Sequence, residues 1–246
     1  MRSGPYACAC GVCKSTPVDN TVLRGQYTAV SAAPRVQNPY FEEYKRLNPT
    51  LKDPLLDIGS HSFQLYEKLY VAREDLVKRY AWAIPDKKAL DLIAKQGPLV
   101  EMGAGTGYWA SLLRAMGVDI VAYDRAPPGH GPVTRNKWHD PVQYTHVTEG
   151  GPEVLWAHPD RALFLCWPPY ADPFALDCAN LWGGNTLVFV GELGGCTGCD
   201  RFYESLRGSF VRWAYHDIPT WPGLRDFLSV WKRRSTLGTG EVPEDE

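Results

Sequence analysis

Apolar and polar positions along the chain follow two periods, one typical of helices and one typical of strands. Spacings of three and four between apolar residues, or runs of helix formers, predict helices at 61–79, 86–95, 110–116, 172–181 and 202–206. Short apolar or alternating runs predict strands at 98–100, 118–123, 144–147, 161–167, 185–191, 209–216 and 227–232. Strands that alternate with helices are typical of an open α/β sheet, in which ligands bind at the carboxyl ends of the strands.

A glycine-rich stretch, Val100-Glu-Met-Gly-Ala-Gly-Thr-Gly-Tyr-Trp109, joins the first predicted strand to a helix. Its glycines let the backbone turn tightly and approach a ligand closely. The helix that follows directs its unpaired N–H groups at the turn. The next apolar strand ends in Asp124, about 20 residues beyond the first glycine, where a nucleoside-binding fold needs an acceptor for ribose hydroxyls.

The spacing of the glycines distinguishes between nucleoside ligands. A dinucleotide site requires G-x-G-x-x-G, whereas this chain has G-x-G-x-G with Tyr108 in place of the third glycine. Glu101 would also lie close to phosphates and repel them. A ligand with an ammonium group and a ribose therefore fits better, and a turn without ligand or an NAD site are the alternatives.

This stretch resembles motif I of the class I S-adenosylmethionine-dependent methyltransferases, with Asp124 matching their ribose-binding acid. The resemblance implies a bound S-adenosylmethionine, with the glycines under its methionine part and Glu101 near its amino group. It implies a Rossmann-like α/β sheet of seven strands whose last pair is antiparallel. The organisation expected is a flexible Cys-containing tail at 1–35, an N-terminal helical cap at 36–85, the methyltransferase domain at 86–235 and a disordered tail at 236–246.

The stretch Arg161-Ala-Leu-Phe-Leu-Cys-Trp-Pro-Pro-Tyr170 is the second informative one. Two prolines have no N–H to donate, so the strand ends there, and their carbonyls are expected to be free to accept hydrogen bonds. The stretch resembles motif IV of the amino-methyltransferases, Asp/Asn/Ser-Pro-Pro-Tyr/Phe, which hold a target NH₂ group. The first position here is Trp167, whose indole only donates. The carbonyl of Trp167 or Pro168 would then accept from the substrate instead, or activity is lost.

These resemblances and the positions around the two motifs give a set of expected site residues. Tyr80 and Trp82 precede the first strand, where the chain in this fold passes near the methionine end of the cofactor, although core packing is the alternative for both. Glu192 follows the strand at 185–191 and either borders the substrate or is a solvent-exposed loop residue. The residues expected at the catalytic position are Trp167, Pro168, Pro169 and Tyr170. The residues expected to bind the cofactor are Tyr80, Trp82, Glu101, Gly103, Ala104, Gly105, Gly107, Trp109, Asp124, Arg125 and Cys166.

Charge and composition leave the methyl acceptor open. The chain of 246 residues has a net charge of −2, so no global field favours nucleic acid, and Lys232-Arg-Arg234 is its compact basic run. Against this, 9 Trp, 13 Tyr and 8 Phe could line a pocket for a flipped base. The function expected is S-adenosylmethionine-dependent methyl transfer, with an exocyclic or amide nitrogen as one acceptor. The alternatives are an inactive cofactor-binding or partner-binding module and a nucleic-acid base N-methyltransferase.

Cysteine usage and hydropathy bear on location and metals. The 7 cysteines, without a secretory signal, are expected to be free thiols in a reducing cytoplasm. No run of about 18 apolar residues predicts a membrane span. Three cysteines, Cys8, Cys10 and Cys13, could hold zinc if Cys196 or Cys199 supplied a further ligand. No resident metal is assigned.

Overall fold

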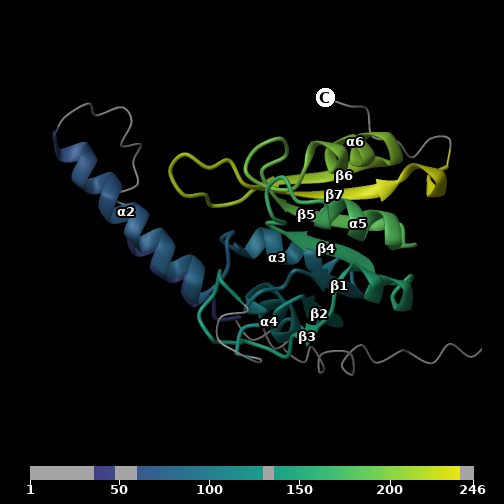
Figure 1. The fold of residues 1–246 in the computed structure, drawn as a ribbon, viewed down its shortest axis with the longest axis horizontal. Coiled ribbons are helices and arrows are strands. Elements are labelled where there is room, and N and C mark those ends of the chain that lie inside the picture. The colour runs from purple at the N-terminus through teal and green to yellow at the C-terminus, as the bar shows by residue number, and fades with distance from the viewer. Residues whose placement is uncertain (1–35, 48–59, 130–135, 239–246) are drawn as a thin grey trace, which may run out of the picture. The chain divides into compact units, whose positions relative to one another are not determined.

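A single seven-stranded sheet forms the centre of the computed structural model, which describes residues 36–47, 60–129 and 136–238 (Figure 1). The strand order is β3-β2-β1-β4-β5-β7-β6, and β7 runs antiparallel to both of its neighbours. In this order the antiparallel strand β7 lies between β5 and β6, as in the Rossmann-like class I methyltransferase sheet, so the predicted fold class is confirmed. The strands are β1 (Leu99–Met102), β2 (Ile120–Asp124), β3 (Thr148–Glu149), β4 (Ala162–Cys166), β5 (Thr186–Gly191), β6 (Phe210–Asp217) and β7 (Phe227–Arg233).

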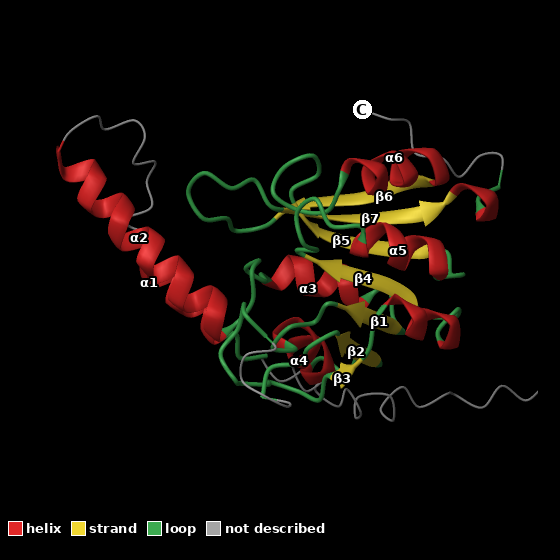
Figure 2. Cartoon of the chain, in the orientation of Figure 1, coloured by secondary structure: helices red, strands yellow, loops and turns green. Residues whose placement is uncertain are grey.

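Helices cover both faces of this sheet (Figure 2). Side chains alternate across a strand, so Leu99 of β1 joins the core with α3 and α4, whereas Val100 and Met102 join the core with α5 and α6. Two buried apolar layers therefore fix the sheet between them. The helices are α1 (Pro39–Leu47), α2 (Ser60–Arg79), α3 (Lys87–Ala94), α4 (Tyr108–Ala115), α5 (Phe174–Leu181) and α6 (Asp200–Ser209), with short 3-10 helices at Pro152–Ala157 and Arg234–Thr236.

The third strand is the predicted element that was wrong. It was expected at 144–147, and the structure instead has a two-residue strand at Thr148–Glu149, directly after the predicted residues. Tyr144 instead belongs to an aromatic cluster, with its ring 5.6 Å from Tyr80 and 4.9 Å from Tyr108. Its backbone N–H donates to the carbonyl of Thr106 in the glycine turn. This segment thus pairs with the turn and not with the sheet edge.

The N-terminal helices pack on the same core as α3 and α4. Asn38 caps α1 by accepting from the N–H of Phe41, and its amide donates to the carbonyl of Pro85. Tyr40 is fully buried, and its hydroxyl accepts from the indole N–H of Trp221 in the β6–β7 connection. This helical layer is therefore anchored to segments on both sides of the predicted boundary at residue 85. The predicted tail at 1–35, and residues 239–246 of the tail predicted at 236–246, lie outside the described residues, whereas Thr236 ends a short 3-10 helix.

Asp86 begins α3 as predicted and also ties that helix to the sheet. Its carboxylate accepts from the N–H of Ala89 at 2.7 Å and lies 2.9 Å from Nε2 of His216 on β6. Asp86→Ala is expected to lower the free energy of unfolding by about 1–2 kcal/mol, because both the cap and the contact with His216 are lost. Denaturant unfolding measures this, with Asp91→Ala as the control. Asp91 pairs only with exposed Lys87 on the same helix, so an equal loss in that variant would contradict the assignment.

Candidate functional site

The glycine turn between β1 and α4 has the backbone that its sequence predicted. Gly103, Gly105 and Gly107 have φ angles of 72°, 52° and 70°, which side-chain-bearing residues rarely adopt. Asp124, at the end of β2, accepts from the N–H of Gly105 at 2.8 Å and from the N–H of Ala126 at 2.8 Å. The acid predicted for a ribose is therefore held against the turn, with lone pairs left for a ligand.

Glu101 is a buried carboxylate at the start of this turn. Its side chain is 1% exposed, and within the described residues its Oε2 atom has no hydrogen-bond partner. Burial raises its pKa to about 8, and the charge of Asp124 adds to the rise, while Arg114 and the N–H of Ala110 oppose it. An unpaired buried carboxylate destabilises a folded protein. A ligand that brings an ammonium group to this position would pair the charge, so Glu101 and Asp124 together fit the methionine and ribose ends of S-adenosylmethionine.

The segment after β2 covers one side of the turn. A Cβ atom at Gly105 would lie 2.6 Å from Nε2 of His139. The other ring nitrogen of His139 is 3.1 Å from the carbonyl of Val77, at the end of α2. Burial lowers the pKa of this imidazole, which favours the neutral form. The sequence contained no signal for His139, since it lies 34 positions from the glycine that it contacts.

The other residues expected at the cofactor site lie at different depths. Tyr80 is buried, and its hydroxyl donates to Glu43. Trp109 lies in the core against Phe164, 5.8 Å between ring centroids. Ala104 is half-buried, Arg125 is exposed, and burial raises the pKa of the Cys166 thiol.

Trp167 has the most unusual environment in the Pro-Pro stretch. Its φ angle is 52°, a left-handed conformation that is rare for a bulky residue and is concentrated at functional sites. Its ring stacks on Trp82 with centroids 5.0 Å apart and planes 16° apart. The guanidinium of Arg73 lies 5.5 Å from the Trp82 ring and 5.9 Å from the Trp167 ring. Trp82, expected at the cofactor, and Trp167, expected at the catalytic position, are thus in contact.

The hydrogen bonds of the two prolines correct one expectation. The carbonyl of Pro168 accepts from the N–H of Gly198 at 3.0 Å, and that of Pro169 accepts from the N–H of Asp172 at 3.4 Å. The expectation that these carbonyls are free was therefore wrong, because the loop after β5 folds back onto Pro168, and Pro169 closes a local turn with Asp172. Tyr170 is 71% exposed and lines a second pocket of about 390 Å³ with the start of α6.

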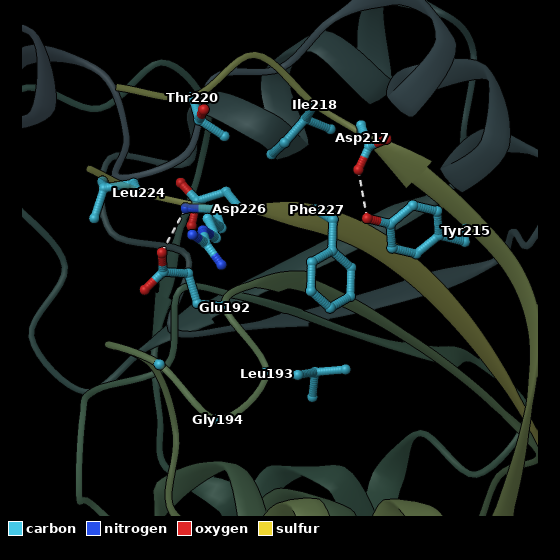
Figure 3. A pocket seen from close by; sticks show the side chains of 12 residues that line it. Glu192, Leu193, Gly194, Tyr215, Asp217, Ile218, Thr220, Leu224, Asp226 and Phe227 are labelled. Carbon is cyan, nitrogen blue, oxygen red and sulfur yellow. Dashed lines mark hydrogen bonds between the residues drawn. The ribbon is translucent and has the colours of Figure 1, made fainter. Parts of the chain in front are cut away.

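A larger pocket of about 690 Å³ opens beside Trp167, at the carboxyl ends of β5 and β6 (Figure 3). Asp226 is 3% exposed, lines this pocket and accepts from Nε1 of Trp167 at 2.8 Å. Burial raises the pKa of Asp226 to about 7, against the lowering effect of Trp167 and Arg73. The sequence predicted Glu192 at this edge but not Asp226. The pocket is lined by Glu192, Leu193, Gly194, Gly195, Tyr215, Asp217, Ile218, Thr220, Leu224, Arg225, Asp226 and Phe227.

The described residues provide neither a metal-binding cluster nor a membrane-spanning helix. Among residues 36–47, 60–129 and 136–238, no group of three or more His, Cys, Asp or Glu side chains could hold a metal ion. Cys196 and Cys199 are free thiols, whereas Cys8, Cys10 and Cys13 lie outside the part of the chain that the structure describes. None of the described helices is long and apolar enough to cross a membrane.

Comparisons with known proteins give one match to a family model and a set of similar solved structures. Residues 71–169 match the model of a methyltransferase domain family, and no curated protein gives a significant match. An rRNA methylase from Streptococcus thermophilus is 18% identical, covering 61% of this chain and 99% of that one, with a TM-score of 0.39. The N-methyltransferase NodS from Bradyrhizobium japonicum, solved with S-adenosylhomocysteine, is 13% identical over 78% and 98% of the chains, with a TM-score of 0.40. A 1,6-didemethyltoxoflavin-N1-methyltransferase from Burkholderia thailandensis is 17% identical over 68% and 89%, with a TM-score of 0.39. The strand order and the domain match thus agree on the class I methyltransferase fold.

Proposed function

We propose that this protein is an S-adenosylmethionine-dependent methyltransferase. The observation that carries the proposal is the pair of carboxylates, Glu101 and Asp124, at the glycine turn of a class I sheet. Glu101 would pair with the amino group of the cofactor, and Asp124 would accept from its ribose hydroxyls. When bound, the cofactor supplies an electrophilic methyl group on a sulfonium. The chain then contributes mainly position, by holding the acceptor in line with that group.

The Pro-Pro turn and the pocket beside it bear on the class of methyl acceptor. The engaged carbonyl of Pro168 and the exposed ring of Tyr170 are unfavourable for the flat NH₂ site of the amino-methyltransferases. Acidic side chains in the neighbouring pocket are unfavourable for a phosphate-bearing nucleic acid. A small molecule is thus favoured over a nucleic-acid base. An inactive cofactor-binding module remains the second candidate, since Trp167 replaces the side chain that accepts from the substrate in the active motif.

Calorimetric titration with S-adenosylmethionine and, separately, with NAD tests the cofactor. Binding of S-adenosylmethionine alone is expected, and Asp124→Ala should weaken it by about tenfold or more because the ribose loses its acceptor. The matched control is Asp119→Ala, which removes an exposed acid at the opposite end of β2, where Asp119 pairs with Arg161. That variant should bind as the wild type does. A folded sample that binds NAD, or that binds no S-adenosylmethionine, would rule out the proposed cofactor.

A further inference from the structure

We propose that Asp226 supplies the carboxylate that position 167 lacks, and that the pocket beside it binds an amine as the methyl acceptor. This inference rests on the proposed methyltransferase function and deepens it. In the motif that the Pro-Pro turn resembles, an acid or amide side chain stands at the first position, where this chain has Trp167. Here the indole N–H of that residue donates to Asp226, 59 positions further along the chain. The side chain that accepts the hydrogen bond thus lies at the start of β7 in this protein and not at the end of β4.

Several contacts hold Trp167 and Asp226 in this arrangement. The backbone of Trp167 leaves the extended conformation of β4 directly after Cys166, with a φ angle of 52°. Its stack on Trp82 and the nearby guanidinium of Arg73 stabilise a conformation that costs about 1–2 kcal/mol in isolation. Trp167 is then a positioning residue, since its indole orients the carboxylate and does not itself accept from a substrate.

Asp226 is the buried carboxylate of the pocket and has one oxygen left for a ligand, whereas Asp217, which also accepts on one oxygen, is exposed to solvent. Glu192 already accepts on both oxygens from the backbone N–H groups of Cys196 and Arg225. Asp217 accepts from the hydroxyl of Tyr215, a contact that Figure 3 marks. Asp226 accepts on Oδ1 from Trp167, and no described residue donates to its Oδ2. Because Asp226 is almost fully buried, an N–H group of a ligand would satisfy it.

The composition of the pocket indicates the class of ligand. Three acids and one arginine line it, so a cation is favoured over an anion. Leu224, Ile218 and Phe227 supply apolar surface next to the carboxylates. A small amine with an apolar or aromatic body meets both conditions. Nucleic acid would bring phosphates against Glu192 and Asp217, which repel them.

The chemistry of such a site balances without another reactant. The bound ammonium group would first give one proton to Asp226 Oδ2, which frees the nitrogen lone pair. That lone pair would form the new C–N bond as the C–S bond breaks, and the C–S bonding pair would stay on sulfur as a neutral thioether. The methylated product would leave as an ammonium ion, and Asp226 Oδ2 would then release its proton to water. Its pKa, raised by burial to about 7, suits a group that must take and release a proton near neutral pH.

Benzylamine binding, measured without a methyl donor, tests the inference independently of the cofactor. The wild type is expected to bind benzylamine at least tenfold more tightly than benzyl alcohol, its neutral counterpart. Asp226→Asn keeps the acceptor for Trp167 but removes the charge, so it should weaken benzylamine binding by about tenfold. Asp217→Asn, which removes an exposed acid of the same pocket, should weaken it by less than about threefold. Equal affinity for the two ligands, or undiminished binding by Asp226→Asn, would overturn the proposal.

Carbon-13 NMR titration of Asp226 tests the role of Trp167. Trp167→Phe keeps an aromatic ring but removes the indole N–H, so the pKa of Asp226 should rise. An unchanged pKa would show that Trp167 does not position this carboxylate. Calorimetry with S-adenosylmethionine on the same samples separates the two proposals. If benzylamine binds and S-adenosylmethionine does not, the amine site stands and the methyltransferase function falls; the reverse result has the opposite meaning.

Discussion

The wild-type protein is expected to lose stability as the pH rises from about 5 to above 8, and Glu101→Gln is expected to abolish this loss. The folded protein holds a proton on this carboxyl up to a pKa of about 8, whereas the unfolded chain releases it near the ordinary value of 4.5. Between these values the folded state binds more protons than the unfolded state, so rising pH lowers the free energy of unfolding. The full penalty is present above the folded-state pKa and absent below 4.5.

The size of this effect follows from the burial of the group. Each unit of pKa difference corresponds to about 1.4 kcal/mol, so the rise from 4.5 to about 8 gives a pH-dependent loss on the order of 5 kcal/mol. Glutamine cannot ionise and should abolish this component of the pH dependence. Denaturant unfolding between pH 5 and pH 9 measures it. Glu74→Gln, an exposed glutamate on α2, is the control and should leave the pH profile unchanged. A Glu101→Gln profile parallel to that of the wild type would contradict the assignment.

The same substitution connects stability to the proposed function. A carboxylate that destabilises the empty protein is useful if a ligand pairs its charge. Under the proposed function, Glu101→Gln should therefore weaken S-adenosylmethionine binding by about tenfold or more, while the protein becomes more resistant to denaturant at alkaline pH. If the variant gained stability and still bound S-adenosylmethionine with wild-type affinity, the amino group of the cofactor would not lie at Glu101.

Gly105→Ala is expected to destabilise the fold by about 3 kcal/mol or more. The left-handed backbone at this position, with φ of 52°, costs a residue with a Cβ atom about 1–2 kcal/mol. In addition, the new methyl group would stand 2.6 Å from Nε2 of His139, closer than Cβ atoms approach other groups. The imidazole would have to shift, and its contact with the carbonyl of Val77 would be lost.

A comparison with Gly117 separates the backbone strain from the clash with His139. Gly117 has φ of 85°, and nothing lies within 4 Å of a Cβ atom there. Gly117→Ala should cost only the backbone component, so the difference between the variants measures the clash with His139. Adding His139→Ala to Gly105→Ala should recover part of the loss in a double-mutant cycle. Equal losses in both glycine variants, without recovery in the double variant, would show that His139 does not cover the turn.

The sequence alone determined the features that depend on neighbouring residues. Hydrophobic periodicity located most strands and helices, since the two periods are properties of the local backbone. The spacing of Gly103, Gly105 and Gly107 predicted the left-handed turn, and Asp86 was recognised as a cap, because both depend on groups within a few positions. Residues 144–147 also had an apolar pattern, yet Tyr144 packs on Tyr80 and Tyr108, so tertiary packing overrode the local preference there.

Only the tertiary structure decided how distant segments complete the site. Asp226 reaches Trp167 because β7 is inserted beside β5, and β5 pairs with β4. Likewise, the N–H of Gly198 donates to the carbonyl of Pro168, and the ring of His139 lies against Gly105. Gly198 and His139 both belong to loops that follow other strands. Residues that meet in this way are separated by long connections, so no spacing in the sequence indicates the contact. Their pairing is set by strand order and by the packing of the two faces of the sheet, which are properties of the whole fold.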